Sequence, residues 1–157
     1  MGEFLKQFER VKRYLRRIEN QDRDSTEYDD DLWSFFLHCY HLKDWIKNDT
    51  EVAVEIRQTV EDFVNKNEAL RICADLANRS KHLRLDRVRD DAKITSRSVT
   101  IYPPTAGSDS VGTSTCEHTI TFRDGKKRIA LDVAREAVEA WERFLLDKGL
   151  SMRGKSP

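Results

Sequence analysis

The chain has 157 residues, of which 38% are apolar and 36% charged, and its 28 basic and 28 acidic side chains give a formal net charge of zero. This length suits a single domain with a proper core, and the neutrality argues against non-specific coating of nucleic acid, which usually needs a basic excess. The sequence has no run of about 18 apolar residues and no apolar signal region at its charged N-terminus, so we expect a cytoplasmic protein without a membrane partner. Three widely separated cysteines suit reduced thiols better than a disulfide framework.

The first predicted element is an amphipathic helix over residues 3–20. Its apolar residues recur at spacings of three and four, which is the period of one helix face: Phe4, Phe8, Val11, Leu15 and Ile18. Five basic residues fill the other faces: Arg10, Lys12, Arg13, Arg16 and Arg17. These side chains suit either a solvated face or a face that contacts phosphate groups. The acid-rich stretch that follows reads as a loop leading into the next helix.

Three more helices are predicted before residue 85. The second, over residues 29–48, is apolar nearly all round, so we expect it to be the buried central helix of a bundle. The third covers residues 51–65, with Thr50 as its N-cap. The fourth covers residues 67–83, and its apolar side holds Leu70, Cys73, Leu76 and Ala77.

After residue 85 the sequence becomes rich in threonine, valine and isoleucine. Short antiparallel strands are predicted near residues 93–102, 115–123 and 127–131, with Asp124-Gly125 at a tight turn between the last two. His118 alternates with the strand residues, and we expect it to have a structural role on the sheet. The stretch 103–114 between the first two strands is rich in proline, glycine and serine, which indicates a loop.

A last helix is predicted over residues 132–148, with Asp132 as its N-cap and Gly149 as its C-cap. The fold class is therefore mainly α: an antiparallel bundle of about five helices, with a small β-hairpin or three-stranded insertion before the last helix. We expect one domain over residues 1–150, with the β insertion at about 93–131 and a frayed tail at 151–157.

Two apolar helices carry polar residues that call for an explanation. His38, His41 and Asp44 share a broad stripe of the second helix. The fourth helix has a polar face with Lys81 beside it, formed by Arg71, Asp75, Asn78, Arg79 and His82. Buried polar groups without partners cost about 1–3 kcal/mol each, so the two faces are expected to meet. His41, Asp44 and Asp75 would then belong to a buried polar network that sets the helix register.

A metal site is a second interpretation of the same residues. His38, His41, Asp44 and His82 could ligate a divalent ion, in a bundle that resembles the histidine-triad DinB family. The familiar helical signature, two histidines at i and i+4 with a glutamate, is absent from the sequence. We therefore predict no metal and no other cofactor.

The third interpretation starts from the stretch "DLANRSKHLRL". An arginine and a histidine late in an apolar helix, with an asparagine beside the arginine, resemble the HEPN superfamily of small helical bundles over residues 28–85. In this chain two residues separate Arg79 from His82, and Asn78 precedes the arginine. The resemblance implies metal-independent RNA cleavage. His82 would be general acid or base, Arg79 or Lys81 would hold the phosphate, and Asn78 would orient it.

The sequence leaves two functions open. The first is a non-enzymatic interaction module with a buried polar network, whose sheet edge and loop bind a protein partner or a second copy by strand addition. The alternative is a HEPN-like ribonuclease that acts on RNA in a defence or toxin–antitoxin setting, and the resemblance implies that it acts as a dimer. The sequence contains no glycine-rich phosphate loop and no nucleophile motif, which favours the first function.

Overall fold

The computed structural model describes residues 2–81, 92–102 and 113–150, with the backbone alone at residues 81, 95–102 and 113–116. Within these ranges the helices are α1 (Glu3–Asn20), α2 (Thr26–Asn48), α3 (Val54–Lys66), α4 (Glu68–Lys81) and α5 (Ala130–Asp147). The strands are β1 (Lys93–Tyr102), β2 (Thr113–Thr121) and β3 (Lys127–Ile129). The predicted class, a mainly α bundle with a small antiparallel sheet before its last helix, is confirmed. The tail that we expected to fray lies outside the described residues.

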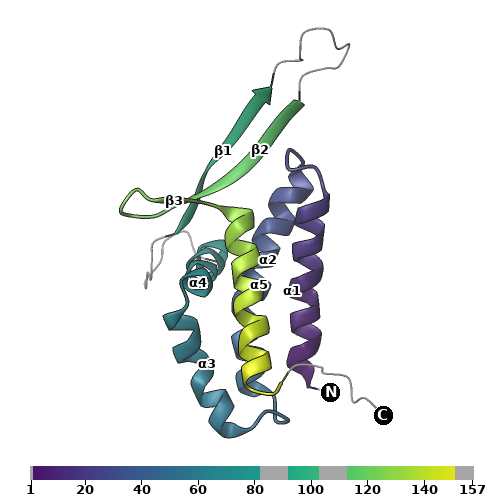
Figure 1. Ribbon diagram of the computed structural model, residues 1–157, viewed down its shortest axis with the longest axis vertical. Coiled ribbons are helices and arrows are strands. Elements are labelled where there is room, and N and C mark those ends of the chain that lie inside the picture. Colours follow the sequence, from purple (N-terminus) through teal and green to yellow (C-terminus); the bar gives the residue numbers. More distant parts are fainter. Residues whose placement is uncertain (1, 82–91, 103–112, 151–157) are drawn as a thin grey trace.

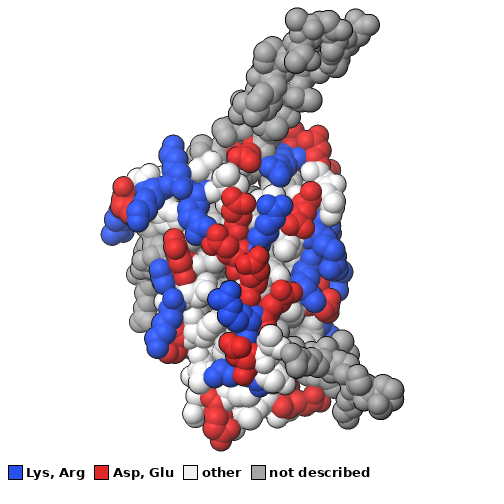
Figure 2. All heavy atoms as spheres, in the orientation of Figure 1, with Lys and Arg blue, Asp and Glu red and all other residues white. Residues whose placement is uncertain are grey.

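The helices pack around α2, as its apolar sequence predicted. α2 contacts each of the other helices, because apolar residues lie on most of its sides. α1 runs antiparallel to α2, α5 lies beside both, and α3 and α4 close the other flank (Figure 1). Acidic and basic side chains intermingle over the face drawn in Figure 2, in keeping with the zero formal charge.

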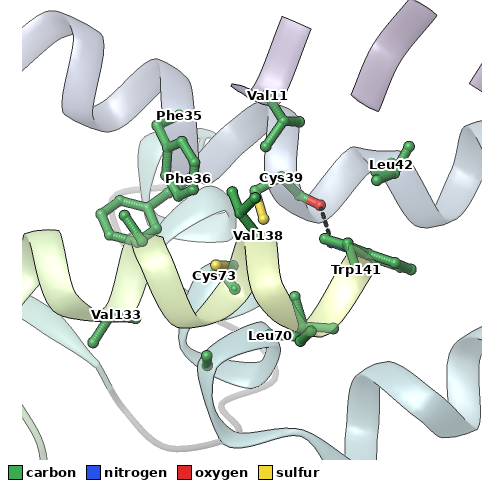
Figure 3. Close-up of a cluster of buried hydrophobic side chains, with 14 of the residues drawn as sticks. Val11, Phe35, Phe36, Cys39, Leu42, Leu70, Cys73, Val133, Val138 and Trp141 are labelled. Carbon is green, nitrogen blue, oxygen red and sulfur yellow. Dashed lines mark hydrogen bonds between the residues drawn. The ribbon is translucent and has the colours of Figure 1, made fainter. Parts of the chain in front are cut away.

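The core lies where α2, α4 and α5 meet (Figure 3). Trp141 of α5 is fully buried, and its indole Nε1 donates a hydrogen bond of 3.1 Å to the carbonyl oxygen of Cys39 on α2. Cys39 and Cys73 are both buried and free. Burial and the neighbouring Cys39 thiol raise the pKa of Cys73 well above its ordinary value, so this thiol is protonated and packs as a small apolar side chain.

The starts of α2 and α3 each differ from the prediction by three residues. α2 starts at Thr26, three residues early, because the hydroxyl of Ser25 accepts a hydrogen bond of 3.1 Å from the backbone N–H of Tyr28 and caps the helix. α3 starts at Val54, so the prediction of Thr50 as its N-cap is wrong. The buried carboxylate of Asp49 instead accepts bonds from the N–H groups of Phe4 (3.2 Å) and Glu51 (2.9 Å), which ties this turn to the start of α1.

The last helix follows β3 without a loop. It begins at Ala130, so Asp132 lies in its first turn and is not the N-cap; the acid still lies near the positive end of the helix dipole. At the other end Gly149 follows the C-cap residue Lys148 and has a φ of 69°, a left-handed conformation that favours glycine. The predicted C-cap is therefore displaced by one residue: Lys148 is the C-cap, and Gly149 is the left-handed residue that follows it.

The sheet is antiparallel with the order β1-β2-β3. The turn between β2 and β3 holds Gly125 at a φ of 84°, as the Asp-Gly pair predicted. β3 pairs only with residues 119–121 of β2, whereas β1 pairs with β2 along its whole length, with one irregularity between Ile94 and Ser96. The β1–β2 hairpin therefore extends away from one end of the helical bundle (Figure 1).

Candidate functional site

The polar side of α4 holds the segment that leads into the sheet. Asp75 is fully buried, and its carboxylate accepts a hydrogen bond of 3.3 Å from the backbone N–H of Ala92. One turn further along, Nε of Arg79 donates a bond of 2.9 Å to the carbonyl oxygen of the same residue. Two side chains of one helix thus fix both backbone groups of Ala92, the residue before β1.

The residues predicted for RNA chemistry lie at the end of this helix. Asn78 and Arg79 are partly buried in its last turns, and Lys81 is its last residue. His82, the predicted acid or base, lies outside the described residues. The ribonuclease site therefore stays a prediction.

Asp44 does not belong to a buried network, which corrects our expectation. Its side chain is 50% exposed and lies 3.7 Å from the ammonium group of Lys43. Its neighbour Trp45 is also exposed, because the last turns of α2 reach the surface beside the start of α1. Asp75, which we expected in the same network, contacts Ala92 as described above, and His41 lies against the ring of Tyr40, 5.8 Å between centroids.

A polar cluster that the sequence did not reveal joins α1 to α2. Gln7 is buried, and its amide nitrogen lies 3.3 Å from Nδ1 of His38 and 3.1 Å from the His38 carbonyl oxygen. The amide oxygen of Gln7 accepts a bond of 2.6 Å from Arg10, and the His38 ring stacks on Tyr14 at 5.2 Å. Burial, Arg10 and His41 lower the pKa of His38, so its ring is neutral and Nδ1 accepts the hydrogen bond. The hint in the sequence was that Gln7 lies three residues after Phe4 and four before Val11, and so shares the apolar side of the first helix.

A second cluster joins α2 to α3. The ammonium group of Lys43 is largely buried and lies 3.0 Å from the carboxylate of Glu61, which also lies 3.3 Å from Lys47. Burial opposes the charge on Lys43, but the hydrogen bond to Glu61 and the nearby Asp44 outweigh it and raise the pKa of the lysine. This lysine is therefore a structural cation that links two helices.

Of the four residues considered as metal ligands, His38, His41 and Asp44 lie within the described ranges. Over the described ranges, no three side chains of histidine, cysteine, aspartate or glutamate come together in a way that could hold a metal ion. Nδ1 of His38 is occupied by Gln7, and His82 is outside these ranges.

His118 joins the hairpin to the bundle. It is buried at the base of β2, where its Nε2 donates a hydrogen bond to the carboxylate of Asp29 on α2 and its ring packs on Tyr28 at 5.0 Å. Beside it, Arg23 lies 3.4 Å from Glu117. The expectation that His118 serves a structural role on the sheet agrees with this position. The α1–α2 corner therefore holds the base of the projecting hairpin, which makes the hairpin the strongest candidate for a functional element.

No family model, curated protein or solved structure matches this chain. The HEPN resemblance is thus a hypothesis that rests on residues 78–82 and the helical class. None of the helices in the described ranges combines the length and the apolar character needed to cross a membrane.

Proposed function

We propose that this chain is a non-enzymatic interaction module that acts as a homodimer, with the β1–β2 hairpin as its binding element. The observation that carries the proposal is the edge of this hairpin. β1 runs for 10 residues, and the sheet order β1-β2-β3 leaves its outer side without a strand among the described residues. Such an edge presents a row of N–H and C=O groups, which is a template for another strand.

An added strand would stabilise the outer part of the hairpin. Positions 113–118 of β2 pair with β1 but not with β3, so this part of the sheet has two strands in the described structure. A two-stranded hairpin is marginally stable in water, whereas three or more strands with a packed face can be stable. Addition of a strand to β1 would supply that stability.

A second copy of the chain is the partner that these features favour. An antiparallel strand edge can pair with itself across a two-fold axis, which is the commonest symmetry of soluble oligomers. The chain has no net charge, so two copies approach without net repulsion. A pairing centred on the middle of β1 would put Lys93 opposite Tyr102 and Arg97 opposite Ser98, so that no two like charges face each other.

The proposal is tested by the substitution Ser98→Lys. Across the proposed two-fold axis it would place a lysine opposite Arg97 twice, and each like-charge pair costs up to about 1 kcal/mol, so dimerisation should weaken roughly tenfold. Within the hairpin Ser98 pairs with Glu117, so the new lysine should not weaken the fold. Analytical ultracentrifugation over a range of concentrations measures the dissociation constant, and the difference should shrink at high salt.

Thr100→Lys is the matched control. It adds the same charge two residues along the same strand, where the proposed pairing meets Thr95 and the hairpin itself pairs Thr100 with Thr115. It should leave the dimer unchanged. The proposal is wrong if the wild-type chain stays monomeric up to about 100 μM, the weak end of specific association, or if both lysines weaken the dimer equally.

The ribonuclease remains the competing hypothesis, and one assay separates it from the interaction module. Wild-type protein is incubated with a mixed RNA pool beside His82→Ala. If the wild-type protein cleaves RNA and the substitution lowers the cleavage rate by about 10²–10⁴, His82 transfers a proton in the reaction. The proposal of a purely non-enzymatic module would then be wrong.

A further inference from the structure

A surface pocket lies between the C-terminal half of α1 and the first turns of α2, away from the hairpin edge. Its volume is about 690 Å³, and its lining includes Arg13, Arg16, Arg17, Glu27 and Asp31. Basic side chains gather over α1 in this part of the molecule, at the right of Figure 2. Pockets for small organic ligands fall in this size range, which exceeds what a single inorganic ion needs.

Asp31 organises one wall of the pocket. Its side chain is only 8% exposed, and one carboxylate oxygen lies 2.9 Å from Arg17 while the other accepts a bond of 2.6 Å from the amide of Gln21. The guanidinium of Arg17 also lies over the ring of Tyr14, 5.5 Å from its centroid. A buried carboxylate and an aromatic ring thus hold this arginine in one orientation before any ligand arrives.

The guanidinium groups of Arg13 and Arg16 are available to bind an anionic ligand. Arg128 and Arg135 of the sheet and α5 each hold a carboxylate, whereas no carboxylate lies within ion-pair distance of Arg13 or Arg16 in the described part of the chain. Residues 13, 16 and 17 are three and four positions apart, so they share one side of the helix. Guanidinium groups in this arrangement match the geometry of a phosphate, which they bind through paired N–H donors.

Glu27 adds a hydrogen-bond acceptor to the basic side chains of the pocket. It lines the same pocket from the first turn of α2, and among the described residues no cation lies within ion-pair distance of it. A carboxylate at this place would repel a bare phosphate but would accept hydrogen bonds from hydroxyl or amino groups. The lining therefore suits a ligand that has an anionic end and a donor end.

We propose that this pocket binds an organic phosphate of nucleotide size. Arg13, Arg16 and Arg17 hold the phosphate, and Glu27 accepts a hydrogen bond from a hydroxyl or amino group elsewhere on the ligand. The proposal is independent of the dimer, because none of these residues belongs to the hairpin.

The test is a titration followed by nuclear magnetic resonance and calorimetry, with AMP, adenosine and inorganic phosphate as probes at constant ionic strength. AMP should bind saturably, one per chain, and shift the amide signals of residues 13–31. Inorganic phosphate and adenosine should each bind at least roughly tenfold more weakly, because each satisfies only one end of the pocket.

Three variants locate the binding. The double substitution Arg13→Gln with Arg16→Gln should weaken AMP binding roughly tenfold or more, and glutamine preserves helix propensity, so circular dichroism should be unchanged. Glu27→Gln should weaken AMP but not inorganic phosphate. Arg143→Gln, which removes an exposed arginine of α5, is the matched control and should change nothing.

Two outcomes would overturn the proposal. The first is no saturable AMP binding, or binding whose signal shifts fall outside the α1–α2 corner. The second is equal loss of binding in the Arg143 variant and in the double variant, which would mean diffuse attraction to arginine in general.

Discussion

Buried polar residues of this bundle pair with the nearest available backbone or side-chain group, and each pair fixes one local junction. Asp75 holds the backbone of Ala92, and Gln7 holds the ring and carbonyl oxygen of His38. Asp44, by contrast, is half exposed and is solvated. The cost of substitution at each residue follows from burial rather than from charge.

Asp75→Ala should destabilise the fold far more than Asp44→Ala. Loss of the buried carboxylate removes the acceptor for the Ala92 N–H and should lower the free energy of unfolding by about 1–3 kcal/mol. Substitution of the half-exposed Asp44 should change it by no more than about 0.5 kcal/mol. Urea unfolding of both variants measures the two free energies of unfolding. Equal values would mean that the Ala92 contact contributes nothing.

His38 should make stability depend on pH. Its folded pKa lies below the value of 6.5 expected for the unfolded chain, so below pH 6.5 the unfolded chain takes up the proton first. The contribution to stability is therefore complete above pH 6.5 and is lost as pH falls toward the lower folded pKa. Urea unfolding at several pH values should show a smaller loss between pH 7 and 5 in His38→Gln, and an unchanged profile would contradict this assignment.

At the scale of elements, the hairpin is held to the bundle at its base. β1 contacts α4 and β2 contacts α5, while His118 and Glu117 reach the α1–α2 corner. The outer parts of β1 and β2 pair only with each other among the described elements, so their stability depends on this base. The base is where a substitution should loosen the whole hairpin.

His118→Ala should lower the free energy of unfolding by about 1–3 kcal/mol, through lost packing on Tyr28 and the lost bond to Asp29. Amide hydrogen exchange should speed up most along β2. Glu117→Ala, at the next residue of the strand, removes only a partly exposed ion pair and should cost within about 1 kcal/mol. Slower or unchanged exchange in the His118 variant would mean that the hairpin is held elsewhere.

At the scale of the molecule, one apolar cluster joins every helix, and Trp141 lies near its centre. Its ring packs against Phe63 of α3 and Phe144 of α5, and its indole nitrogen reaches α2. This side chain therefore links α5 to both α3 and α2, and Figure 3 shows its hydrogen bond to the Cys39 carbonyl oxygen. The two-fold dimer proposed above leaves this core untouched.

Trp141→Phe should therefore cost about 1–3 kcal/mol, from the cavity and from the lost bond to the Cys39 carbonyl oxygen. Trp45→Phe provides the control, since that ring is 37% exposed and should cost within about 0.5 kcal/mol. Thermal or urea unfolding of the pair gives the comparison. If Trp45→Phe lowered the free energy of unfolding as much as Trp141→Phe, Trp141 would not lie at the centre of the core.

The helices, the sheet, the Asp-Gly turn and Gly149 followed from the sequence alone, because apolar periodicity and backbone preference act over a few neighbouring residues. The helix starts at Thr26 and Val54 did not, because local side-chain hydrogen bonds shape the chain there: Ser25 accepts from the N–H of Tyr28, and Asp49 accepts from the N–H groups of Phe4 and Glu51 in the turn before α3. Among the site residues, the sequence placed Asp75 in a buried network with the second helix, whereas its carboxylate accepts a bond from the backbone of Ala92 before β1. Which faces meet depends on how whole helices pack, so only the tertiary structure decided that His38 meets Gln7, that Asp44 faces solvent, and that His118 anchors a hairpin to Asp29.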